Sequence, residues 1–581
     1  MYFRYLKIFE SYIGSKIYSV FSLSVLTVFL ESIGIAMLMP VFDREAVSVF
    51  SKLMDEIIGY LGLPDSYPSM LSIISVLFLL KGLLNYRVLR ALAVMRGELL
   101  ETMKLKIVKG TTDGDYQKIL QKNPGYYSNL ANEQVVKAVQ CFYALMQTAA
   151  NFFAAMIYLA SALYVQFLFG TLALFSGLII FFGFRFVNSR IKSVSRQRAL
   201  QIGGLASLLV DFFGDLDYLK ATNQTKKLSA LVEKKVEGLK RLEVKNGQLA
   251  ALAQSMREPL AVLQITIVAI IGTIFFELQL SAMMVSVLLL YRCVNAIFAI
   301  QTFWQSAMEN VGSVESIDNE IKRLKVNSKK DLIKYKNFTM KENIKLEAIS
   351  FKYDFSEDYS LENISLTINA GDKIGFVGRS GSGKSTLMKI LCGLLEVREG
   401  QIVVDGVSHS FFNNSFWQAQ IGFVPQGTPL FDGSIRDNVT LFEVPGKVNK
   451  TVFLDALKSS AVFEFFADSE QSLDRESLSN YSALSGGQRQ RLTIAREFYR
   501  QPSILIFDEA TSALDKVSER NISLAIEEMG DSVTAVVVSH RKSTIVHLDW
   551  VFVLDNGKIV ESGTPDDLGR DQNSFYSRVI G

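Results

Sequence analysis

The sequence predicts a polytopic helical membrane domain in its N-terminal half, followed by an α/β domain built around a phosphate-binding loop. Three observations support this fold class. The 581 residues are 49% hydrophobic with a mean hydropathy of +0.23, which suits a membrane domain joined to a soluble one rather than a single soluble core. About six apolar segments of bilayer length lie before residue 306. After residue 341, strand-like runs alternate with helical runs around a glycine-rich loop.

The apolar segments have the length that a helix needs to cross a bilayer, about 20 residues. The run between Lys137 and Arg185 contains no charged residue and is too long for one span, so we expect it to hold two spans that turn near residue 166. The expected spans are residues 17–41, residues 69–93, the two within this run, residues 259–276 and residues 278–305. Residues 1–305 are therefore expected to form the membrane domain.

Two amphipathic helices are expected at the membrane surfaces. Residues 1–16 mix basic residues with aromatic and aliphatic ones and show no cleavable signal-peptide pattern, so we expect a helix lying on the membrane before the first span. In residues 47–61 apolar side chains recur at helical spacing, which predicts a second surface helix on the opposite face of the membrane.

The distribution of charge predicts the orientation. Lys and Arg are concentrated in residues 94–140 and 188–257, whereas residues 43–68 hold only Arg44 and Lys52. Because an excess of Lys and Arg marks the cytoplasmic side, both chain ends are expected in the cytoplasm, in a multi-pass protein of the inner membrane. Helical periodicity in the two basic intervals predicts that the spans continue as helices beyond the bilayer. The formal net charge of +3 is too small to indicate a nucleic-acid partner.

Residues 306–340 lose the apolar character and become rich in Lys and Asn, so we expect a linker there. The remaining residues, 341–581, are enough for one α/β domain.

A glycine-rich loop lies at residues 378–386, between an apolar strand and an amphipathic helical run. This context makes the pattern G-x-x-x-x-G-K-[ST] a phosphate site, since the glycines let backbone N–H groups close around phosphate oxygens at a helix N-terminus. We expect Lys384 to reach the β and γ phosphates and Ser385 to bind Mg²⁺. The expected nucleotide ligands in this loop are Gly378, Ser380, Gly381, Gly383, Lys384, Ser385 and Thr386. A chance match would occur in a few per cent of chains this long, roughly.

A second element of the site is a continuous apolar run, residues 504–507, followed by Asp508 and Glu509. Such a run predicts a buried parallel strand, whose carboxyl end is where α/β sheets bind ligands. We expect Asp508 to hold Mg²⁺ and Glu509 to orient or deprotonate the attacking water. The alternative is an acidic pair that only caps the next helix. The presence of the phosphate loop in the same domain disfavours this alternative.

Several further motifs resemble the ATP-binding cassette (ABC) transporters, over residues 341–581 and in the family's order. Leu484 to Gln488, with the letters LSGGQ, is similar to the family's signature sequence. Residues 511–515, with the letters TSALD, resemble its D-loop. The resemblance makes Tyr353 the aromatic residue that stacks on adenine, Gln426 the Q-loop glutamine and His540 the switch histidine. It also makes Asp515 the D-loop aspartate, and the signature residues are Ser485, Gly486, Gly487 and Gln488.

The resemblance implies an ATP hydrolase coupled to transport, with ATP and Mg²⁺ as cofactors. Two nucleotide domains would meet head to tail, so a second copy of the chain is the expected partner and would supply the signature residues. Glu509, His540 and Gln426 would be catalytic, and Gln426 would join Ser385 and Asp508 at the metal. Intact motifs in this one chain favour a homodimer.

The sequence departs from the family at two places. Residues 473–483 lack the Gly-Glu-Arg-Gly pattern that many exporters carry before the signature, and Glu497 replaces a small residue that commonly follows Ala-Arg. Asp113 to Leu120 and Phe212 to Ala221 occupy the places of the family's two cytoplasmic coupling segments; the alternative is ordinary loop helices.

The substrate is indicated by three ionisable residues inside the expected spans, Glu31, Lys81 and Arg292. Such residues are costly in a bilayer and face a cavity or a partner. Arg292 could bind an anionic headgroup, or Glu31 could form a structural pair with Arg292 or Lys81. The long external segment at residues 47–61 resembles the lipid-linked oligosaccharide flippases, a branch of these exporters; the alternative is a lid over the cavity mouth.

We therefore expect an ATP-driven exporter or flippase of an amphipathic anionic lipid or lipid-linked glycan, with peptides or hydrophobic drugs as the alternative substrates. A cassette protein that acts without transport would lack the expected spans. A channel or receptor gated by ATP would tolerate weakened catalytic residues, whereas Glu509 and His540 argue for turnover.

Overall fold

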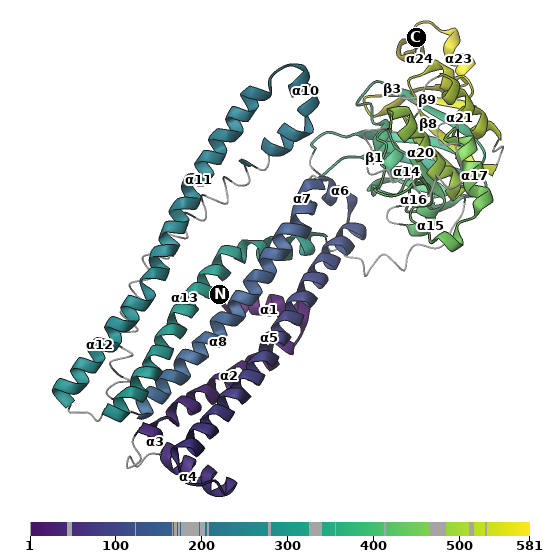
Figure 1. The fold of residues 1–581 in the computed structure, drawn as a ribbon. Coiled ribbons are helices and arrows are strands. Elements are labelled where there is room, and N and C mark those ends of the chain that lie inside the picture. Colours follow the sequence, from purple (N-terminus) through teal and green to yellow (C-terminus); the bar gives the residue numbers. More distant parts are fainter. Residues whose placement is uncertain are drawn as a thin grey trace. The chain divides into compact units, whose positions relative to one another are not determined.

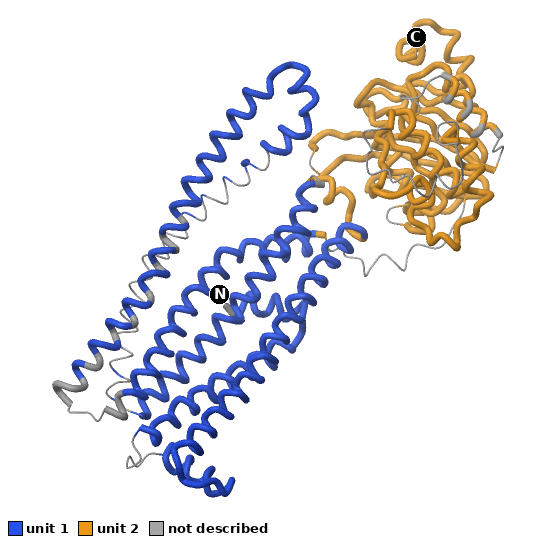
Figure 2. Tube along the Cα trace, in the orientation of Figure 1, with its two compact units in different colours: residues 1–112, 124–323 blue, residues 113–123, 324–581 orange. Residues whose placement is uncertain are grey.

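The computed structural model describes two compact units, which Figure 2 colours separately. One unit holds residues 1–112 and 124–323, and the other holds residues 113–123 and 324–581. The described residues are 2–42, 49–122, 124–165, 208–276, 280–324, 340–354, 356–411, 414–463, 484–510, 516–528 and 532–580, with single residues between 166 and 207.

The first unit consists of helices, several of them much longer than a bilayer is thick (Figure 1). Their bounds are α1 Tyr2–Ile13, α2 Lys16–Ala36, α3 Met39–Phe42, α4 Val49–Leu61, α5 Tyr67–Thr112, α7 Pro124–Asn129, a π-helical turn at Leu130–Gln134, α8 Val135–Val165, α10 Leu216–Ala221, α11 Thr225–Ser255, α12 Arg257–Phe276 and α13 Leu280–Leu324. Because α5 has 46 residues and α13 has 45, each extends well past the ~20 residues that a span requires.

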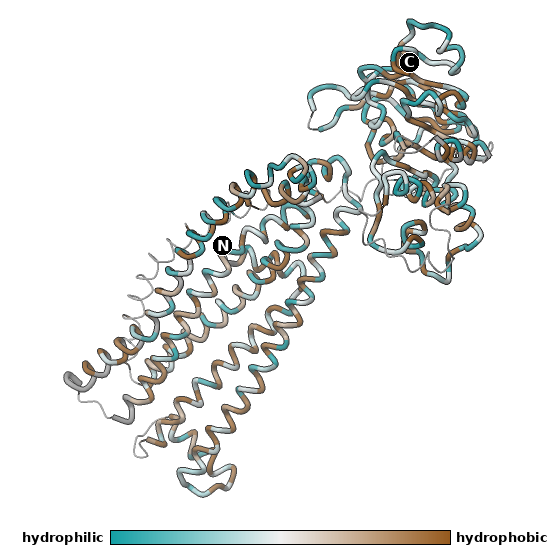
Figure 3. Tube along the Cα trace, turned by 45° about the horizontal axis from the view of Figure 1, so that its top comes forward, coloured by the Kyte–Doolittle hydropathy of each residue, from teal (hydrophilic) through white to brown (hydrophobic). Residues whose placement is uncertain are grey.

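Within the described residues, four helical segments are long and apolar enough to cross a membrane: Lys16–Phe42, Tyr67–Thr112, Gly125–Val165 and Met284–Leu324. They coincide with four of the six expected spans. The expected span at 259–276 is helix α12, and the one between 170 and 185 lies outside the described residues. Along the long helices, apolar colour dominates toward α3 and α4, and hydrophilic colour increases toward α10 (Figure 3).

Residues 306–324, which the sequence assigns to the linker, belong to helix α13. This part of the helix buries Val311, Val314 and Ile317 in the core of the unit, and it buries the charged Glu320 as well. A polar composition therefore concealed a helical extension, and the rest of the expected linker, residues 325–339, lies outside the described residues.

The two amphipathic segments are helical, as expected, and each buries apolar side chains against neighbouring helices. Helix α1 buries Tyr5, Phe9 and Ile13, spaced four residues apart, and the Tyr5 hydroxyl donates to Glu315 Oε1 at 2.7 Å. Helix α4 buries Met54 and Ile58 among residues of α2 and α5.

The second unit contains two sheets. Strands β1 Asn343–Phe351, β2 Leu361–Asn369, β4 Glu399–Val404 and β5 Val407–His409 form an antiparallel sheet in the order β2-β1-β4-β5. Strands β3 Lys373–Gly378, β6 Ile421–Val424, β7 Ile504–Asp508, β8 Thr534–Val538, β9 Trp550–Asp555 and β10 Lys558–Gly563 form the other, in the order β10-β9-β3-β8-β7-β6. Strands β3, β8, β7 and β6 are parallel neighbours, so their carboxyl ends share one edge.

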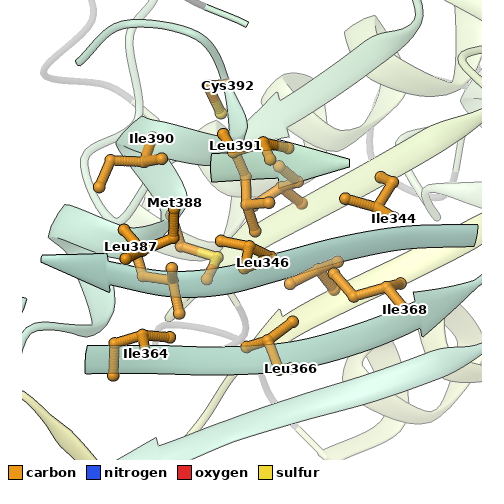
Figure 4. Packing of buried hydrophobic residues seen from close by; sticks show 14 of the residues in the cluster. Ile344, Leu346, Ile364, Leu366, Ile368, Leu387, Met388, Ile390, Leu391 and Cys392 are labelled. Carbon is orange, nitrogen blue, oxygen red and sulfur yellow. The ribbon is translucent and has the colours of Figure 1, made fainter. Parts of the chain in front are cut away.

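Helices pack around these sheets. Their bounds are α6 Tyr116–Leu120, α14 Lys384–Leu391, α15 Ser415–Ala419, α16 Ile435–Thr440, a 3₁₀ turn at Pro445–Lys447, α17 Lys450–Ser459, α20 Gly486–Arg500, α21 Lys516–Glu528, α22 Lys542–Ile545, α23 Pro565–Arg570 and α24 Phe575–Ile580. Helix α14 packs Leu387, Met388 and Leu391 against inward-facing residues of β1 and β2, including Leu346 and Leu366 (Figure 4).

Residues 113–123, which include the expected first coupling segment at 113–120, belong to the second unit. Gln117 of α6 is buried, and its Oε1 accepts a hydrogen bond from the Asp354 backbone N–H at 3.3 Å. Tyr116 packs against the core cluster that includes Tyr353. This segment therefore contacts the strand end that carries the expected adenine-stacking residue, whereas the second expected segment, with α10, belongs to the first unit.

Gly393, just after α14, provides a test of this packing. Its φ is +70°, and an added Cβ would lie 2.1 Å from the Phe411 carbonyl oxygen. Gly393→Ala should lower the free energy of unfolding of the nucleotide domain by about 3 kcal/mol or more, because a clash adds to backbone strain. Gly406→Ala is the matched control: φ is +81° with nothing within 4 Å, so only about 1 kcal/mol of strain is expected. Thermal unfolding measures both variants, and equal losses in the free energy of unfolding would contradict the close contact between Gly393 and Phe411.

Candidate functional site

The glycine-rich loop connects β3 to α14. Gly378 has φ +158°, Gly381 +83° and Gly383 +102°. A Cβ on Gly378 would lie 2.1 Å from the Leu554 carbonyl oxygen, and one on Gly383 would lie 2.6 Å from that of Ser360. Neighbouring backbone therefore closes in on the loop, and only glycine fits at these two positions.

The Lys384 ammonium lies inside this loop, where Nζ donates to the carbonyl oxygens of Gly378 at 2.7 Å and Arg379 at 2.9 Å. The Ser382 hydroxyl lies 3.4 Å from the same nitrogen. Burial lowers the pKa of Lys384, and the carboxylates of Glu509 and Asp508 oppose that shift. The loop thus concentrates a cation and backbone donors at the start of a helix, an arrangement that fits a polyphosphate.

The carboxylate of Asp508 ends β7 and meets the first turn of α14. Ser385 Oγ donates to Asp508 Oδ1 at 3.3 Å. Burial raises the pKa of Asp508, the Ser385 hydrogen bond lowers it, and Glu509 raises it further. A hydroxyl and a carboxylate form the hard oxygen donor set that suits Mg²⁺, so these two residues fit the expected metal.

Glu509 lies between two side chains from other strand ends. Gln426 Nε2 donates to Glu509 Oε2 at 2.9 Å, and His540 Nε2 lies 3.2 Å from Glu509 Oε1. Glu509 has φ +53°, and its N–H donates to the Val538 carbonyl oxygen at 3.0 Å. The structure therefore brings together the three expected catalytic residues. Of the three expected metal ligands, Ser385 and Asp508 contact each other directly. The third, Gln426, uses its amide N–H to bond the carboxylate of Glu509.

Tyr353 follows β1, and its hydroxyl lies 3.2 Å from Thr386 Oγ1 in the first turn of α14. Phe351 packs edge-on against its ring, with centroids 5.1 Å apart. Because Thr386 is buried, this contact places the aromatic side chain of Tyr353 beside the phosphate loop.

The expected signature residues form the N-terminus of α20. Ser485 is the N-cap: the Gln488 N–H donates to Ser485 Oγ at 3.2 Å, and the Ser485 N–H donates to Gln488 Oε1 at 2.9 Å. This capping box fixes the helix start and leaves Gly486 and Gly487 in its first turn, next to the positive end of the helix dipole. The expected D-loop residue Asp515 lies outside the described residues.

Two contributors to this site were missed from the sequence. Ser382 was not assigned a role, although it lies inside the glycine motif and contacts Lys384. Asn438 is fully buried and bonds both the N–H and the carbonyl of Phe431, in the segment that follows Gln426. A motif could have indicated Ser382, whereas no spacing in the sequence connects Asn438 to the site.

A polar pocket of about 430 Å³ lies among the helices of the first unit. Glu31 of α2 is 7% exposed, and its carboxylate lies 3.0 Å from Lys81 Nζ of α5 and 3.3 Å from Arg292 NH1 of α13. All three residues line the pocket, together with Asn85, Gln147, Asn151, Tyr158 and Asn295. The structural pairing expected from the sequence is present, since Glu31 contacts both Lys81 and Arg292, and the three residues also line a cavity.

The charges in this cluster do not balance. Two cations share one carboxylate, which leaves one positive charge in excess. Arg292, with a side chain that is 44% exposed, is the more accessible cation. Because incompletely paired charges in membrane-spanning segments are costly, the excess cation favours an anion in the pocket.

The comparisons with known proteins agree with this organisation. Residues 361–512 match the family model described as ABC transporter. A curated protein named ATP-dependent lipid A-core flippase from Francisella tularensis is 38% identical over 237 residues, which cover 41% of this chain and 38% of that protein. One of the same name from Haemophilus influenzae is 35% identical over 294 residues, covering 51% and 49%. The chain thus matches less than half the length of these relatives.

A solved structure described as a bacterial Atm1-family ABC exporter with ATP bound superimposes with a TM-score of 0.78. The match covers 98% of both chains at 18% sequence identity, and it shows that the whole chain has the fold of an ABC exporter. The expected fold class is thereby confirmed, with an α-helical membrane domain ahead of an ABC transporter nucleotide-binding domain.

The charge cluster in the pocket generates a stability prediction. Glu31→Gln should leave two cations uncompensated and cost about 3 kcal/mol or more, because a buried ion pair is broken. Arg292→Ala should cost about 1 kcal/mol or less, since Arg292 is half exposed and the Glu31–Lys81 pair remains. Thermal unfolding of detergent-solubilised variants measures both, and Glu31→Gln combined with Lys81→Gln should recover part of the loss. A larger loss in Arg292→Ala than in Glu31→Gln would contradict the pairing.

Proposed function

We propose that this chain, an ABC half-transporter in which a membrane domain is fused to a nucleotide-binding domain, is an ATP-driven flippase or exporter of an amphipathic anionic lipid or lipid-linked glycan. The observation that carries the ATPase part is the hydrogen-bonded set of Gln426, Glu509 and His540 beside the phosphate loop. Peptides and hydrophobic drugs are the alternative substrates.

The proposed chemistry follows from the positions of the side chains. Glu509 orients or deprotonates the attacking water, while Gln426 and His540 hold its carboxylate at the end of β7. Lys384 and the glycine-rich loop bind the β and γ phosphates, and His540 contacts the γ phosphate. Ser385 and Asp508 would hold Mg²⁺, which neutralises charge on the phosphate oxygens. Tyr353 stacks on adenine.

The proposed assembly is a homodimer in the inner membrane. Ser485, Gly486, Gly487 and Gln488 of one copy would complete the ATP site of the other, with Asp515 of the D-loop nearby. A helix N-terminus of small residues suits this role, because it lets backbone donors approach a phosphate closely. The excess of Lys and Arg in residues 94–140 and 188–257 supports a cytoplasmic N-terminus and nucleotide-binding domain.

The proposed substrate class rests on the pocket and on the relatives. The pocket combines one excess positive charge with apolar walls that include Val88, Leu89 and Leu92, so it suits an anionic group carried by an apolar body. The relatives named lipid A-core flippases support a lipid. Transfer of the headgroup would follow opening and closing of the dimer, through coupling segments at residues 113–120 and 212–221.

Glu509→Gln tests the ATPase. The variant should bind ATP but lose more than about 95% of hydrolysis, because an amide cannot accept the proton of the attacking water. With both nucleotide domains closed on ATP, the purified variant should have a protein mass of twice 65.0 kDa. Steady-state ATPase activity near that of the wild type would rule out Glu509 as the base, and a stable monomer with ATP would contradict the homodimer.

Arg292 tests the substrate. Arg292→Ala should lower lipid flipping in proteoliposomes about tenfold or more while basal ATPase changes less, because a charge-assisted contact to the headgroup is lost. Arg292→Lys should recover only part, since Lys lacks the planar fork that binds an anion through two hydrogen bonds. Arg90→Ala, on α5 outside the residues that line the pocket, is a control. Unchanged flipping in Arg292→Ala at normal stability would favour peptides or drugs.

A further inference from the structure

Glu497 is the residue in helix α20 that departs from the ABC pattern, and the structure places it against strand β6. Its side chain is buried, and Oε2 accepts a hydrogen bond from Arg500 NH1 at 2.7 Å. The backbone N–H of Phe423 also donates to the carboxylate. An added Cβ on Gly422 would lie 3.3 Å from Glu497 Oε2, so the carboxylate packs directly on the backbone of this strand.

The cost of burying this carboxylate is offset by specific partners. Burial raises the pKa of Glu497, whereas the Arg500 ion pair, the charge of Arg496 and the Phe423 N–H lower it. Since β6 is the edge strand of the six-stranded sheet, one of its sides lacks a neighbouring strand among the described residues. A small residue at position 497 would leave the Phe423 N–H without this acceptor.

The contact lies close along the chain to Gln426, the residue whose amide bonds the catalytic carboxylate. Two residues, Val424 and Pro425, separate Phe423 from Gln426. Val424 is fully buried and pairs with Phe507 of β7, and the ring of Pro425 fixes its φ angle. Gln426 then donates to Glu509 at 2.9 Å. A displacement of the end of β6 would therefore displace the amide that holds Glu509.

The same helix also holds the segment on the other side of Gln426. Arg496 Nε donates to the Asn438 carbonyl oxygen at 2.8 Å, and Asn438 bonds the N–H and carbonyl of Phe431 at 2.8 Å each. The guanidinium of Arg496 also lies over the Phe431 ring, 5.1 Å from its centroid. Helix α20 thus contacts the chain on both sides of residues 424–430.

We propose that Glu497 is a positioning residue for ATP hydrolysis, acting through β6: its carboxylate fixes the Phe423 N–H and thereby sets where Gln426 holds Glu509. The inference rests on the proposed ATPase function and adds to it a connection from the signature helix to the catalytic carboxylate within one chain. Glu497 does not touch the nucleotide or the reacting atoms.

The test compares three variants of the full-length protein. Glu497→Ala should lower kcat about three- to tenfold, the range for one lost hydrogen bond in a positioning network, with KM for ATP within about twofold of the wild type. Glu497→Gln keeps an oxygen acceptor for the Phe423 N–H and should retain at least about half of kcat. Leu492→Val is the control, since it removes packing from the same helix in a cluster with α16 and α17 that contains no residue of β6.

A double-mutant cycle tests whether Glu497 acts on hydrolysis through Gln426. In a Gln426→Ala background, Glu497→Ala should lower kcat no further, because the amide through which it acts is gone. Full additivity of the two losses would overturn the proposal, as would an equal loss of kcat in Leu492→Val at matched thermal stability.

Hydrogen–deuterium exchange of residues 421–427 separates this inference from the proposed function, because it requires no hydrolysis. Glu497→Ala should speed exchange of the Phe423 amide and its neighbours at least about fivefold, whereas Glu497→Gln and Leu492→Val should leave it near the wild-type rate. Absence of ATPase activity in the wild type would contradict the proposed function alone, and unchanged exchange in Glu497→Ala would overturn the inference alone.

Discussion

The parallel pairing of four neighbouring strands is the constraint on which the nucleotide site depends. In the order β3-β8-β7-β6, every strand runs in the same direction, so the segments that follow them leave from one edge. Those segments carry the phosphate loop, His540, Asp508 with Glu509, and Gln426. Ser385 and Asp508, which are more than 100 positions apart in the sequence, thereby come within hydrogen-bond distance. The local sequence around each residue does not specify this contact.

Burial inside this arrangement determines the electrostatics. Desolvation lowers the pKa of Lys384 and raises that of Asp508, because burial destabilises the charged form of each group. Neighbouring groups of opposite charge partly offset this effect. A polyphosphate with its metal ion supplies both kinds of charge at once. The site is thus built so that its own charges are compensated best when a nucleotide is present.

A comparable imbalance exists in the membrane unit. Removal of the Glu31 carboxylate would leave Lys81 and Arg292 without the anion that both contact, which makes Glu31 the structural member of the cluster. Arg292 also lines the pocket, and its side chain is more exposed than that of Lys81. In both units, therefore, positive charge with incomplete compensation is the feature that favours an anion.

Much of this protein follows from its sequence alone. Hydropathy over bilayer-length segments identified the membrane helices, because the bilayer imposes length and apolar composition on each span independently of its neighbours. Glycine spacing and an apolar run ending in two acids identified the phosphate loop and Glu509, because those local conformations permit few other residues. The sequence failed where a polar surface concealed a helical core stripe, as in residues 306–324.

Tertiary structure alone decided the contacts that join distant segments. Periodicity could not show that Glu31 meets both Lys81 and Arg292, since the rotation of each helix about its axis depends on packing across the bundle. Nor could spacing show that Glu497 lies on the backbone of β6 or that Gln117 reaches Asp354, since both contacts depend on how helices dock onto strand ends. Local rules determine which residues can act, and the packing of the elements determines which of them meet.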